Sequence, residues 1–292
     1  MKRGDFLSFL TATSFVFNGE NSDDYNLTIA WIGSPDIDTS ENGLNLSLEK
    51  TRNKLNNTTN TYGIQSENIV INFSITKKDF KEIARLESIQ INEWLTSSPT
   101  PKYLAFNDGD SYPLHYYAVC TQIEDVIVGG KLVGKKLRFE TNSPFAFSKK
   151  VEKKFDVINS HIIRINNTSN AINNIIYPKI IISATSSTVV IENVTDKKSV
   201  TINTNDIPSE SDGVKYIKLN SYNMSATDEN NRLIPIYKLG WNNTYKSFIS
   251  AINDYMTNVY WLRFIKGMNE IKITGNCKIT IEYEFPRKAG CL

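Results

Sequence analysis

The chain has 292 residues, of which 40% are hydrophobic and 22% charged, so it can bury a core and does not have the composition of a disordered polymer. Its length fits two domains of ordinary size better than one. With 33 basic and 31 acidic residues the formal net charge is only +2, which argues against a strongly basic surface for nucleic acid or membrane.

Cysteine usage and the N-terminus indicate a reducing compartment. Cys120, Cys277 and Cys291 are odd in number and widely spaced, unlike the even, dense set of a secreted disulfide framework, so we expect free thiols. Polar residues interrupt the N-terminal apolar residues, which makes a poor signal peptide, and no stretch reaches the length of a membrane span. These features predict a protein that is made and assembled in a cytoplasm.

The first 75 residues predict strands and an arm. The aromatic run at residues 15–17 ends at the turn pair Asn18-Gly19, and residues 27–32 resume an extended pattern. Residues 36–66 are rich in Asn, Thr and Ser, so we expect a long exposed hairpin or arm. The next strand alternates along residues 67–75, and its apolar face is formed by Ile69, Ile71, Phe73 and Ile75.

A helix and a long hairpin are predicted next. Residues 76–95 are the best helix candidate, with Thr76 as its cap. The apolar residues at helical spacing are Phe80, Ile83, Leu86 and Ile89, followed by Trp94 and Leu95. Prolines end the helix before a strand at residues 102–106. A hairpin then joins strands at residues 113–128 and 132–141 through the tight turn Gly129-Gly130.

The second half predicts a β-sandwich. The charged run at residues 149–154 resembles a linker, and we therefore divide the chain into domains 1–150 and 151–292. Short apolar runs separated by Asn, Asp, Ser and Gly are typical of a sandwich. The expected strands are residues 162–165, 178–182, 189–191, 200–202, 216–219, 260–264 and 279–283, with a turn or two of helix at 247–254. The fold class is mainly β with a minor α component.

No pattern predicts a metal site or a catalytic site. The two histidines, His115 and His161, lie in different predicted domains, and His115 is expected to pack within an aromatic strand rather than to catalyse. No Gly-x-Ser-x-Gly elbow supports a Ser/His/Asp triad. Asp108-Gly109-Asp110 resembles the start of a calcium loop, but the twelfth position is Val119 instead of a bidentate Glu, so a turn is expected.

Residues 129–136 nearly match a phosphate-binding loop. However, Lys136 occupies the position of the magnesium-binding Ser or Thr, and the residues that follow predict a strand, whereas a phosphate loop must open a helix. A hairpin turn is therefore expected. The pair Glu282 and Glu284 could in principle hydrolyse a glycosidic bond, but acids on a solvated strand face are common and we expect no catalysis.

Five aromatic residues of the second half lie between positions 241 and 261. Packing in the core or at an interface is the expected role of aromatic residues in a sandwich. A sugar-binding face is the alternative, and its candidate platforms are Trp241, Tyr245 and Trp261, with Tyr255 and Tyr260 nearby.

The order of these short motifs resembles the distal tail (Dit) protein family of long-tailed bacteriophages. The opening strand ends at residues 17–19, the helix ends in Trp94-Leu95, and a strand at 104–108 precedes a Tyr-rich strand at 112–118. A Ser-Pro-Phe-Ala segment follows at 143–146. The matching motifs of the second half lie at residues 177–180, 267–273 and 279–287.

The resemblance implies a structural protein of the virion tail tip, with no cofactor and no catalysis. Six copies of an N-terminal belt domain (1–150) would form a ring, with galectin-like sandwiches (151–292) outside it. The implied partners are the major tail tube protein, a tail-associated hub or lysin protein and a receptor-binding protein, while DNA only passes through the channel and no membrane is involved. The arm at 36–66 and the hairpin at 113–141 are the candidate ring interfaces.

Two alternatives from other classes stay open at this point. The sandwich could be a carbohydrate-binding module that contacts the host surface, which saccharide binding by residues 155–292 would indicate. A wall-degrading enzyme would be indicated by cell-wall hydrolysis that Glu282→Gln abolishes. The particle itself could be a phage, a prophage or a tail-like bacteriocin.

Overall fold

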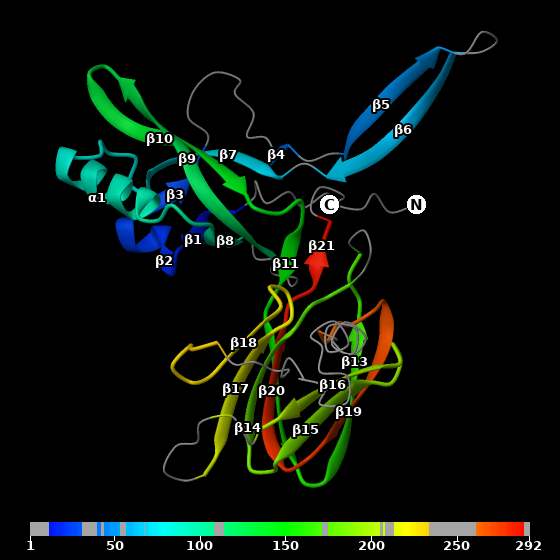
Figure 1. The fold of residues 1–292 in the computed structure, drawn as a ribbon. Helices are drawn as coiled ribbons and strands as arrows, with labels where there is room; N and C mark the ends of the chain where they lie inside the picture. Colours follow the sequence, from blue (N-terminus) through cyan, green and yellow to red (C-terminus); the bar gives the residue numbers. More distant parts are fainter. Residues whose placement is uncertain are drawn as a thin grey trace, which may run out of the picture. The chain divides into compact units, whose positions relative to one another are not determined.

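The computed structural model describes residues 12–30, 40–41, 44–52, 57–66, 68–107, 114–170, 175–204, 207, 213–233 and 261–288, with the backbone alone for 40–66 and Asn203. The described chain is mostly β-strand, in antiparallel sheets, and has a single α-helix, which confirms the expected fold class. Two compact units form (Figure 1). The first comprises Met1–Lys149 and Arg287–Leu292, and the second comprises Lys150–Pro286.

The first unit is built on one curved antiparallel sheet with strand order β2-β1-β8-β9-β10-β7-β3. The amide of Ile29 in β3 donates to the carbonyl of Thr13, just before β1, at 2.9 Å. The last strand of the order therefore lies close to the β1 end of the sheet. β4 pairs β7, and β11 pairs β9 and β21. The strands are β1 (Ser14–Phe17), β2 (Glu20–Asn21), β3 (Leu27–Ile29), β4 (Ser40–Glu41), β7 (Val70–Lys77), β8 (Lys102–Asn107), β9 (Leu114–Val128), β10 (Lys131–Thr141), β11 (Ala146–Ser148) and β21 (Pro286–Arg287).

Aromatic side chains fill the core of the first unit. Phe15 and Phe73 meet edge to face at 5.1 Å between ring centroids, and Phe73 stacks on Phe139 at 5.6 Å. Such pairs stabilise a core by about 0.5–1.5 kcal/mol beyond their burial. The predicted alternation along β7 is confirmed, because the residues of its apolar face are buried: Ile69, Ile71, Phe73 and Ile75.

The helix starts later than predicted. α1 spans Arg85–Thr96, whereas Thr76 belongs to β7 and pairs Gly134 of β10. The predicted apolar stripe is confirmed only in part. Ile83, Trp94 and Leu95 are buried as expected, and Ile91 is buried with them. Phe80, Leu86 and Ile89, in contrast, are exposed. β7 pairs with a strand on each side, so its residues stay extended although the sequence around them has helical spacing. Phe80, at a φ of +56°, then lies in a turn before the helix begins.

Within residues 36–66, where a long exposed hairpin or arm was expected, the described residues 44–52 and 57–66 form a two-stranded ribbon, which confirms the hairpin. β5 (Leu44–Arg52) pairs β6 (Asn57–Ser66) in antiparallel register from Leu44↔Ser66 to Arg52↔Asn57, with an irregularity between Ser47 and Leu48. Among the described strands, β5 and β6 pair only with each other.

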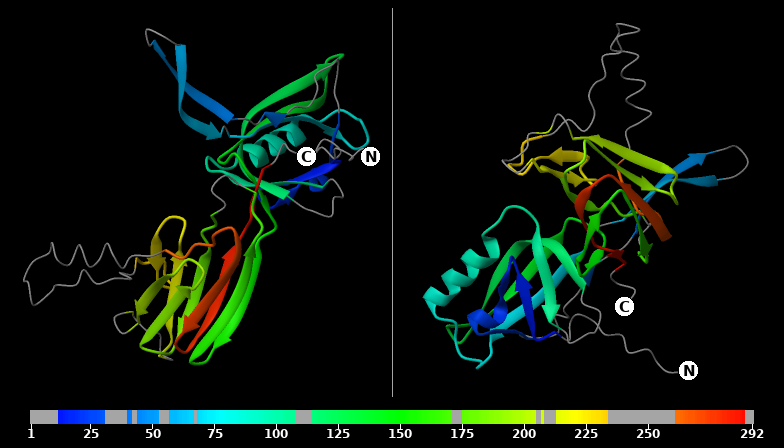
Figure 2. Two further views of the ribbon diagram at one scale, coloured as in Figure 1. Left: turned by 90° about the vertical axis from the view of Figure 1, so that its right-hand side faces the viewer. Right: turned by 90° about the horizontal axis from the view of Figure 1, so that it is seen from below.

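The second unit is a sandwich of two antiparallel sheets (Figure 2). One sheet has the order β12-β20-β14-β17-β18 and the other β13-β19-β15-β16. Both sheets contribute to one core, which includes Ile182, Ile191, Ile217, Ile271 and Ile279. The strands are β12 (Val151–Val157), β13 (Ser160–Asn167), β14 (Lys179–Ala184), β15 (Thr188–Asn193), β16 (Lys198–Asn203), β17 (Lys215–Asn220), β18 (Ser225–Thr227), β19 (Gly267–Thr274) and β20 (Cys277–Tyr283).

Two local predictions in this region are wrong. Residues 151–154 of the supposed linker form the start of β12, an edge strand whose alternating charged side chains face water, as edge strands require. The expected strand at 260–264 is not a strand over its described part. Phe264 makes one isolated bridge to Ile176, and asparagine side chains bind the backbone of Arg263 and Phe264.

Candidate interaction surfaces

Trp94, near the C-terminal end of α1, packs against β1 in the sheet of the first unit. Its indole lies between the rings of Tyr25 (4.6 Å, nearly parallel) and Phe15 (5.4 Å), and its Nε1–H donates to the carbonyl of Phe17 at 3.0 Å. Burial raises the pKa of Tyr25 to about 12, and the hydrogen bond from its hydroxyl to Glu20 adds to this. The helix is therefore held by stacking and by a directional bond at one end.

A buried ion pair supports the hairpin formed by β9 and β10. The side chain of Lys135 is fully buried, and its Nζ lies 2.5 Å from a carboxylate oxygen of Asp125, which is half exposed. The two residues face each other across the ladder, next to an irregularity at Leu132 and Gly134. Removing Asp125 would be costly because the buried ammonium of Lys135 would lose its counter-ion. The pair thus favours one register for the hairpin.

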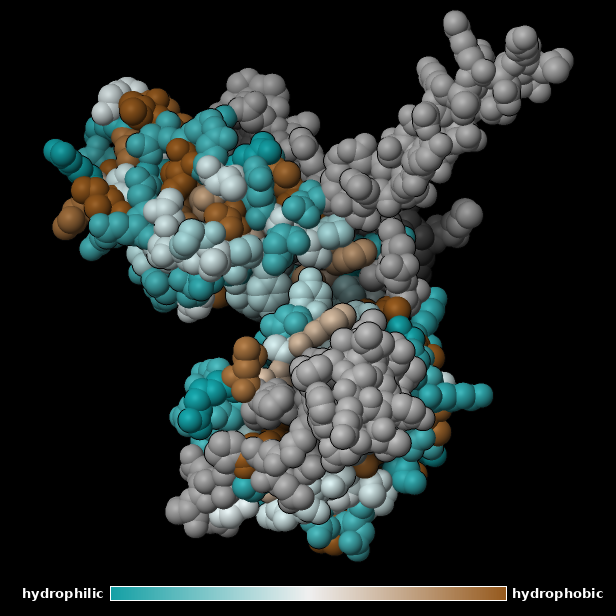
Figure 3. All heavy atoms as spheres, viewed as in Figure 1, coloured by the Kyte–Doolittle hydropathy of each residue, from teal (hydrophilic) through white to brown (hydrophobic). Residues whose placement is uncertain are grey.

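Large apolar side chains are exposed where this hairpin and the helix come together. Phe80 is 76% exposed, Leu86 68% and Ile127 65%, and Ile89 and Val128 are exposed as well. These five residues are called the helix–hairpin patch. Figure 3 shows hydrophobic side chains over α1 and the hairpin. Exposed apolar patches of several hundred Å² on one protein commonly mark interaction sites.

Backbone and ionic contacts join the two parts of the helix–hairpin patch. The amide of Ile83 donates to the carbonyl of Leu132 at 2.7 Å, and Lys131 lies 3.4 Å from Glu82. Leu132 faces Ile127 across the hairpin. The loop before α1 therefore lies against the hairpin close to its turn.

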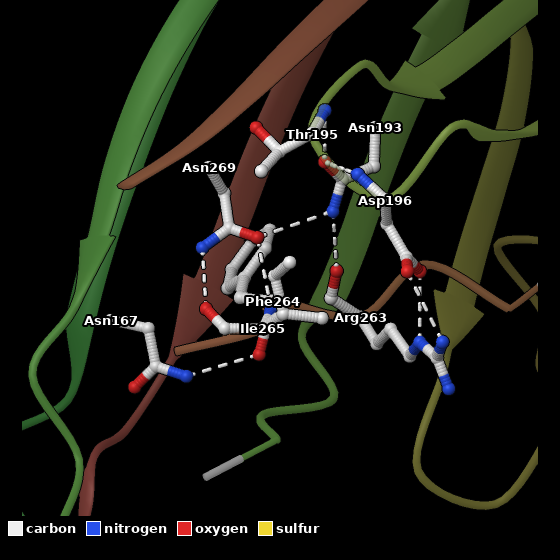
Figure 4. A network of polar contacts seen from close by, with 8 residues as sticks. All are labelled: Asn167, Asn193, Thr195, Asp196, Arg263, Phe264, Ile265 and Asn269. Carbon is white, nitrogen blue, oxygen red and sulfur yellow. Dashed lines mark hydrogen bonds and ion pairs between the residues drawn. The ribbon is translucent and has the colours of Figure 1, made fainter. Parts of the chain in front are cut away.

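A network of asparagines shapes one end of the second unit (Figure 4). Asn167, Asn193 and Asn269 are buried at the ends of β13, β15 and β19. Their side chains bind the backbone of the segment 263–265. The Nδ2 of Asn193 donates to the carbonyl of Arg263 at 2.8 Å, and that of Asn167 to the carbonyl of Phe264 at 3.0 Å.

Asn269 makes the densest contacts of this asparagine network. Its Oδ1 accepts from the amide of Ile265 at 2.9 Å, and its Nδ2 donates to the carbonyls of Ile265 and Gly267 at 2.7 and 2.9 Å. Arg263 forms a two-pronged ion pair with Asp196, at 2.8 and 3.1 Å. Side-chain hydrogen bonds thus satisfy backbone groups of residues 263–265 that a strand would have paired with a neighbouring strand. The sequence analysis did not predict a role for Asn167, Asn193 or Asn269. An Asn at the end of an Ile-rich strand could have indicated a buried side chain that binds the backbone.

The candidate sugar-binding aromatics are only partly within the described structure. Trp241 and Tyr245, with Tyr255 and Tyr260, lie outside the described residues. Trp261 is half-buried and packs against the core of the sandwich. No described contact brings it together with a second aromatic platform, so a sugar-binding role for these residues stays a prediction.

The remaining sequence candidates lie in structural surroundings. His115 is buried in β9 and stacks on Tyr103 at 4.7 Å, which confirms strand packing. Gly129 and Gly130 form the turn of the predicted hairpin, at φ values of +58° and +80°. Glu282 pairs Lys150 at 2.6 Å. Asp108-Gly109-Asp110 lies outside the described residues.

The described residues include two of the three cysteines. Cys120 and Cys277 are free and buried, as expected, whereas Cys291 is not described. Burial raises the pKa of the Cys120 thiol to about 11 and also raises that of Cys277. In the described parts of the chain, His, Cys, Asp and Glu form no group of three that could hold a metal ion. Within the same limits, no helix is long and apolar enough to cross a membrane.

Comparisons with known proteins show what the first half of the chain resembles. Residues 10–143 match the family model described as the phage tail protein N-terminal domain. This part of the chain, a little under half of its length, is therefore similar to the N-terminal domain of phage tail proteins. This confirms the resemblance to a phage tail component that the order of sequence motifs indicated. No curated protein sequence matches the chain.

Solved structures extend the likeness to the fold of nearly the whole chain. The crystal structure of the Dit protein of phage SPP1, described as a paradigm of the hub adsorption apparatus in phages that infect Gram-positive bacteria, has a TM-score of 0.58 and 13% identity. The match covers 93% of this chain and 98% of that one. Chains of the phage P2 baseplate in its activated conformation, with Ca and with Sr, have TM-scores of 0.46 and 0.47 and 10% identity, and the matches cover 84% and 93% of this chain and 88% and 97% of those chains.

Proposed function

We propose that the chain is a distal tail protein, a structural subunit that forms a hexameric ring between the tail tube and the tip. The observation that supports the proposal is the similarity of fold to the SPP1 Dit protein over 93% of this chain. The phage tail match of residues 10–143 supports the same role. The function is assembly rather than catalysis.

Ring formation requires two different surfaces on each copy, because a head-to-tail contact closes only when one surface fits another on the next copy. The first unit offers candidates for both. One is the β5–β6 ribbon, and the other is the hairpin of β9 and β10. The proposed ring would contact the tail tube protein and a tail-associated hub or lysin protein, would dock a receptor-binding protein, and would let DNA pass through its channel.

The molar mass of the purified full chain tests this proposal. Light scattering after size exclusion should give about 200 kDa, six times the 33.1 kDa of one copy, or twice that value for two stacked rings, with six-fold rings in negative stain. Deleting residues 40–64, which contain most of the ribbon, should impair the rings. Unchanged rings after this deletion would remove the ribbon from the interface.

The place in the virion is tested separately. Antibody labelling of intact particles should mark the tip of the tail, and particles made without the chain should lack a tip or a complete tail. Labelling along the whole tube would contradict a role at the tip.

A further inference from the structure

The turn between β1 and β2 consists of Asn18 and Gly19. Phe17 pairs with Glu20 across it, so the two residues form the whole loop. Asn18 has a φ of +52° and Gly19 a φ of +88°, the left-handed conformation that a tight hairpin turn requires. Both residues are exposed. A Cβ added at Gly19 would meet nothing within 4 Å, so the space around the Gly19 backbone is open.

Asparagine is a thermolabile residue, and an asparagine before a glycine loses its side-chain amide most readily. The backbone nitrogen of the following residue attacks the carbonyl carbon of the asparagine side chain. Glycine leaves this approach unhindered because it has no Cβ. Within the residues that the structure describes, Asn18 is the one asparagine that precedes a glycine. The sequence also contains Asn42-Gly43, which lies outside the described residues.

Three other exposed asparagines share the backbone conformation of Asn18 but not its neighbour. Asn26, Asn159 and Asn231 have φ values of +56°, +63° and +60°. They are followed by leucine, serine and arginine. Because conformation and exposure are alike at the four positions, the following glycine distinguishes Asn18. These three residues, called the left-handed asparagines, serve as an internal comparison.

The position of the turn allows the local opening that the attack needs. The Gly19 nitrogen must come to the side of the Asn18 side chain, so the tight turn has to open first. β2 contains only two residues, lies at the end of the strand order and pairs with β1 alone among the described strands. An element with so few contacts opens at a much smaller free-energy cost than the core of the sheet.

The turn also supports the attachment of α1 to the sheet. The Nδ2 of Asn18 donates to the Oγ of Ser97, which follows the helix, at 3.2 Å. The carbonyl of Phe17 accepts the indole hydrogen bond of Trp94 at 3.0 Å. A carboxylate at position 18 removes the donor to Ser97. An isoaspartate, whose backbone runs through the side chain, also adds one backbone atom to the turn and disrupts the pairing of Phe17 with Glu20.

We propose that Asn18 is a site of spontaneous modification, whose conversion to aspartate and isoaspartate loosens the attachment of α1. The Gly19 nitrogen loses its proton and forms a bond to the Cγ of Asn18, the Cγ–Nδ2 bond breaks, and Nδ2 leaves as ammonia. Water then opens the cyclic imide at either of its two carbonyls, which gives aspartate or isoaspartate. The reaction consumes only water and needs no partner, so it does not depend on the proposed ring.

Incubation of the purified full-length chain at pH 8 tests the chemistry. Cleavage after glutamate yields a peptide that ends at Glu20 and separates Asn18 from Asn42. Mass spectrometry should show modification at Asn18 at least ten times faster than at the left-handed asparagines. The rate should be much lower at pH 6, because the attacking nitrogen must lose its proton. Protein isoaspartyl methyltransferase should methylate the product, and the chain in urea gives the rate for a fully open turn.

Asn18→Gly tests the structural consequence, because glycine keeps the positive φ of the turn and has no side chain to modify. After incubation at pH 8, the Tm of the wild type should fall as the modified fraction grows. Asn18→Gly should melt at the same temperature before and after incubation. Asn159→Gly, at an exposed left-handed turn of the second unit, is the matched control and should lose Tm on incubation as the wild type does.

Two results would overturn the inference. One is modification of Asn18 in the native chain no faster than at the left-handed asparagines, and rapid modification of Asn18 in urea would then show that the fold protects the turn. The other is full conversion of Asn18 with an unchanged Tm, which would show that the turn does not support the attachment of α1.

Discussion

Substitution of Asn269 by alanine should destabilise the second unit strongly, although it removes only a small polar side chain. The amide and carbonyl of Ile265 are bound to the Asn269 side chain at 2.9 and 2.7 Å, and the carbonyl of Gly267 at 2.9 Å. A buried backbone group left without a partner costs about 1–3 kcal/mol. Allowing for water that enters the space, we expect a total loss of about 3 kcal/mol.

Differential scanning calorimetry of the full chain measures this loss. For a unit of this size, running from Lys150 to Pro286, 3 kcal/mol corresponds to a fall in Tm of about 10 °C. Asn269→Asp should be at least as damaging, because a carboxylate cannot donate to the two carbonyls. Asn166→Ala, at an exposed position of β13, is the matched control and should shift the Tm by no more than about 2 °C. Equal, small shifts for Asn269→Ala and Asn166→Ala would refute the reasoning.

Three further outcomes follow from the first unit. Lys135→Met should change the free energy of unfolding in urea by no more than about 1 kcal/mol, since half-exposed Asp125 can turn to water, whereas Asp125→Ala should cost about 3 kcal/mol because it leaves the buried ammonium without a counter-ion. Equal losses for the two variants would contradict this asymmetry. Cys120 should resist alkylation at pH 8 in the native state, as followed by mass spectrometry, because its raised pKa keeps the thiol protonated; rapid native labelling would show that it is accessible. Trp94→Phe keeps a ring for stacking but leaves the Phe17 carbonyl without its donor, so thermal melting should report a loss of about 1–3 kcal/mol, and an unchanged Tm would mean that water replaces the indole.

Strands and turns were predictable because their signals are local. The alternation through Ile71 and Phe73 reports one buried face of a strand, and Gly129-Gly130 supplies the positive φ values of a tight hairpin turn. Residues 36–66 were predicted as a hairpin or arm from their polar composition, and the β5–β6 ribbon lies within them. The assignment of most of the chain to antiparallel β-structure therefore needed no information about distant contacts.

The errors arose where distant contacts decide the conformation. Phe80, Leu86 and Ile89 repeat with helical spacing, but strand pairing extends β7 to Lys77 and leaves these residues exposed. Charges at residues 151–154 looked like a linker because the sequence does not show that an edge strand needs charges on its open side. The segment ending at Phe264 has strand-forming residues, yet it is held by asparagines from three other strands, among them Asn193.

The candidate surfaces were less accessible to sequence reasoning than the fold. The hairpin at 113–141 was named as an interface, but the exposed residues beside it were assigned to a helix core. Leu86 is an example. Its spacing in the sequence predicts a core position, whereas its exposure in the structure indicates a contact surface. The asparagine network combines residues that are about 100 positions apart, such as Asn167 and Asn269.

The pairing of β21 with β11 has a consequence for the order of events during translation. β11 ends at Ser148 and β21 contains Arg287, so the ribosome adds about 140 residues between the two strands. At ~5–20 residues per second this takes on the order of ten seconds. Throughout that time β11 has one of its two strand neighbours, and the sandwich emerges from the ribosome before the first unit can be completed. A nascent chain that stalls before residue 286 would therefore carry an unfinished first unit, and only the full-length product is ready for assembly.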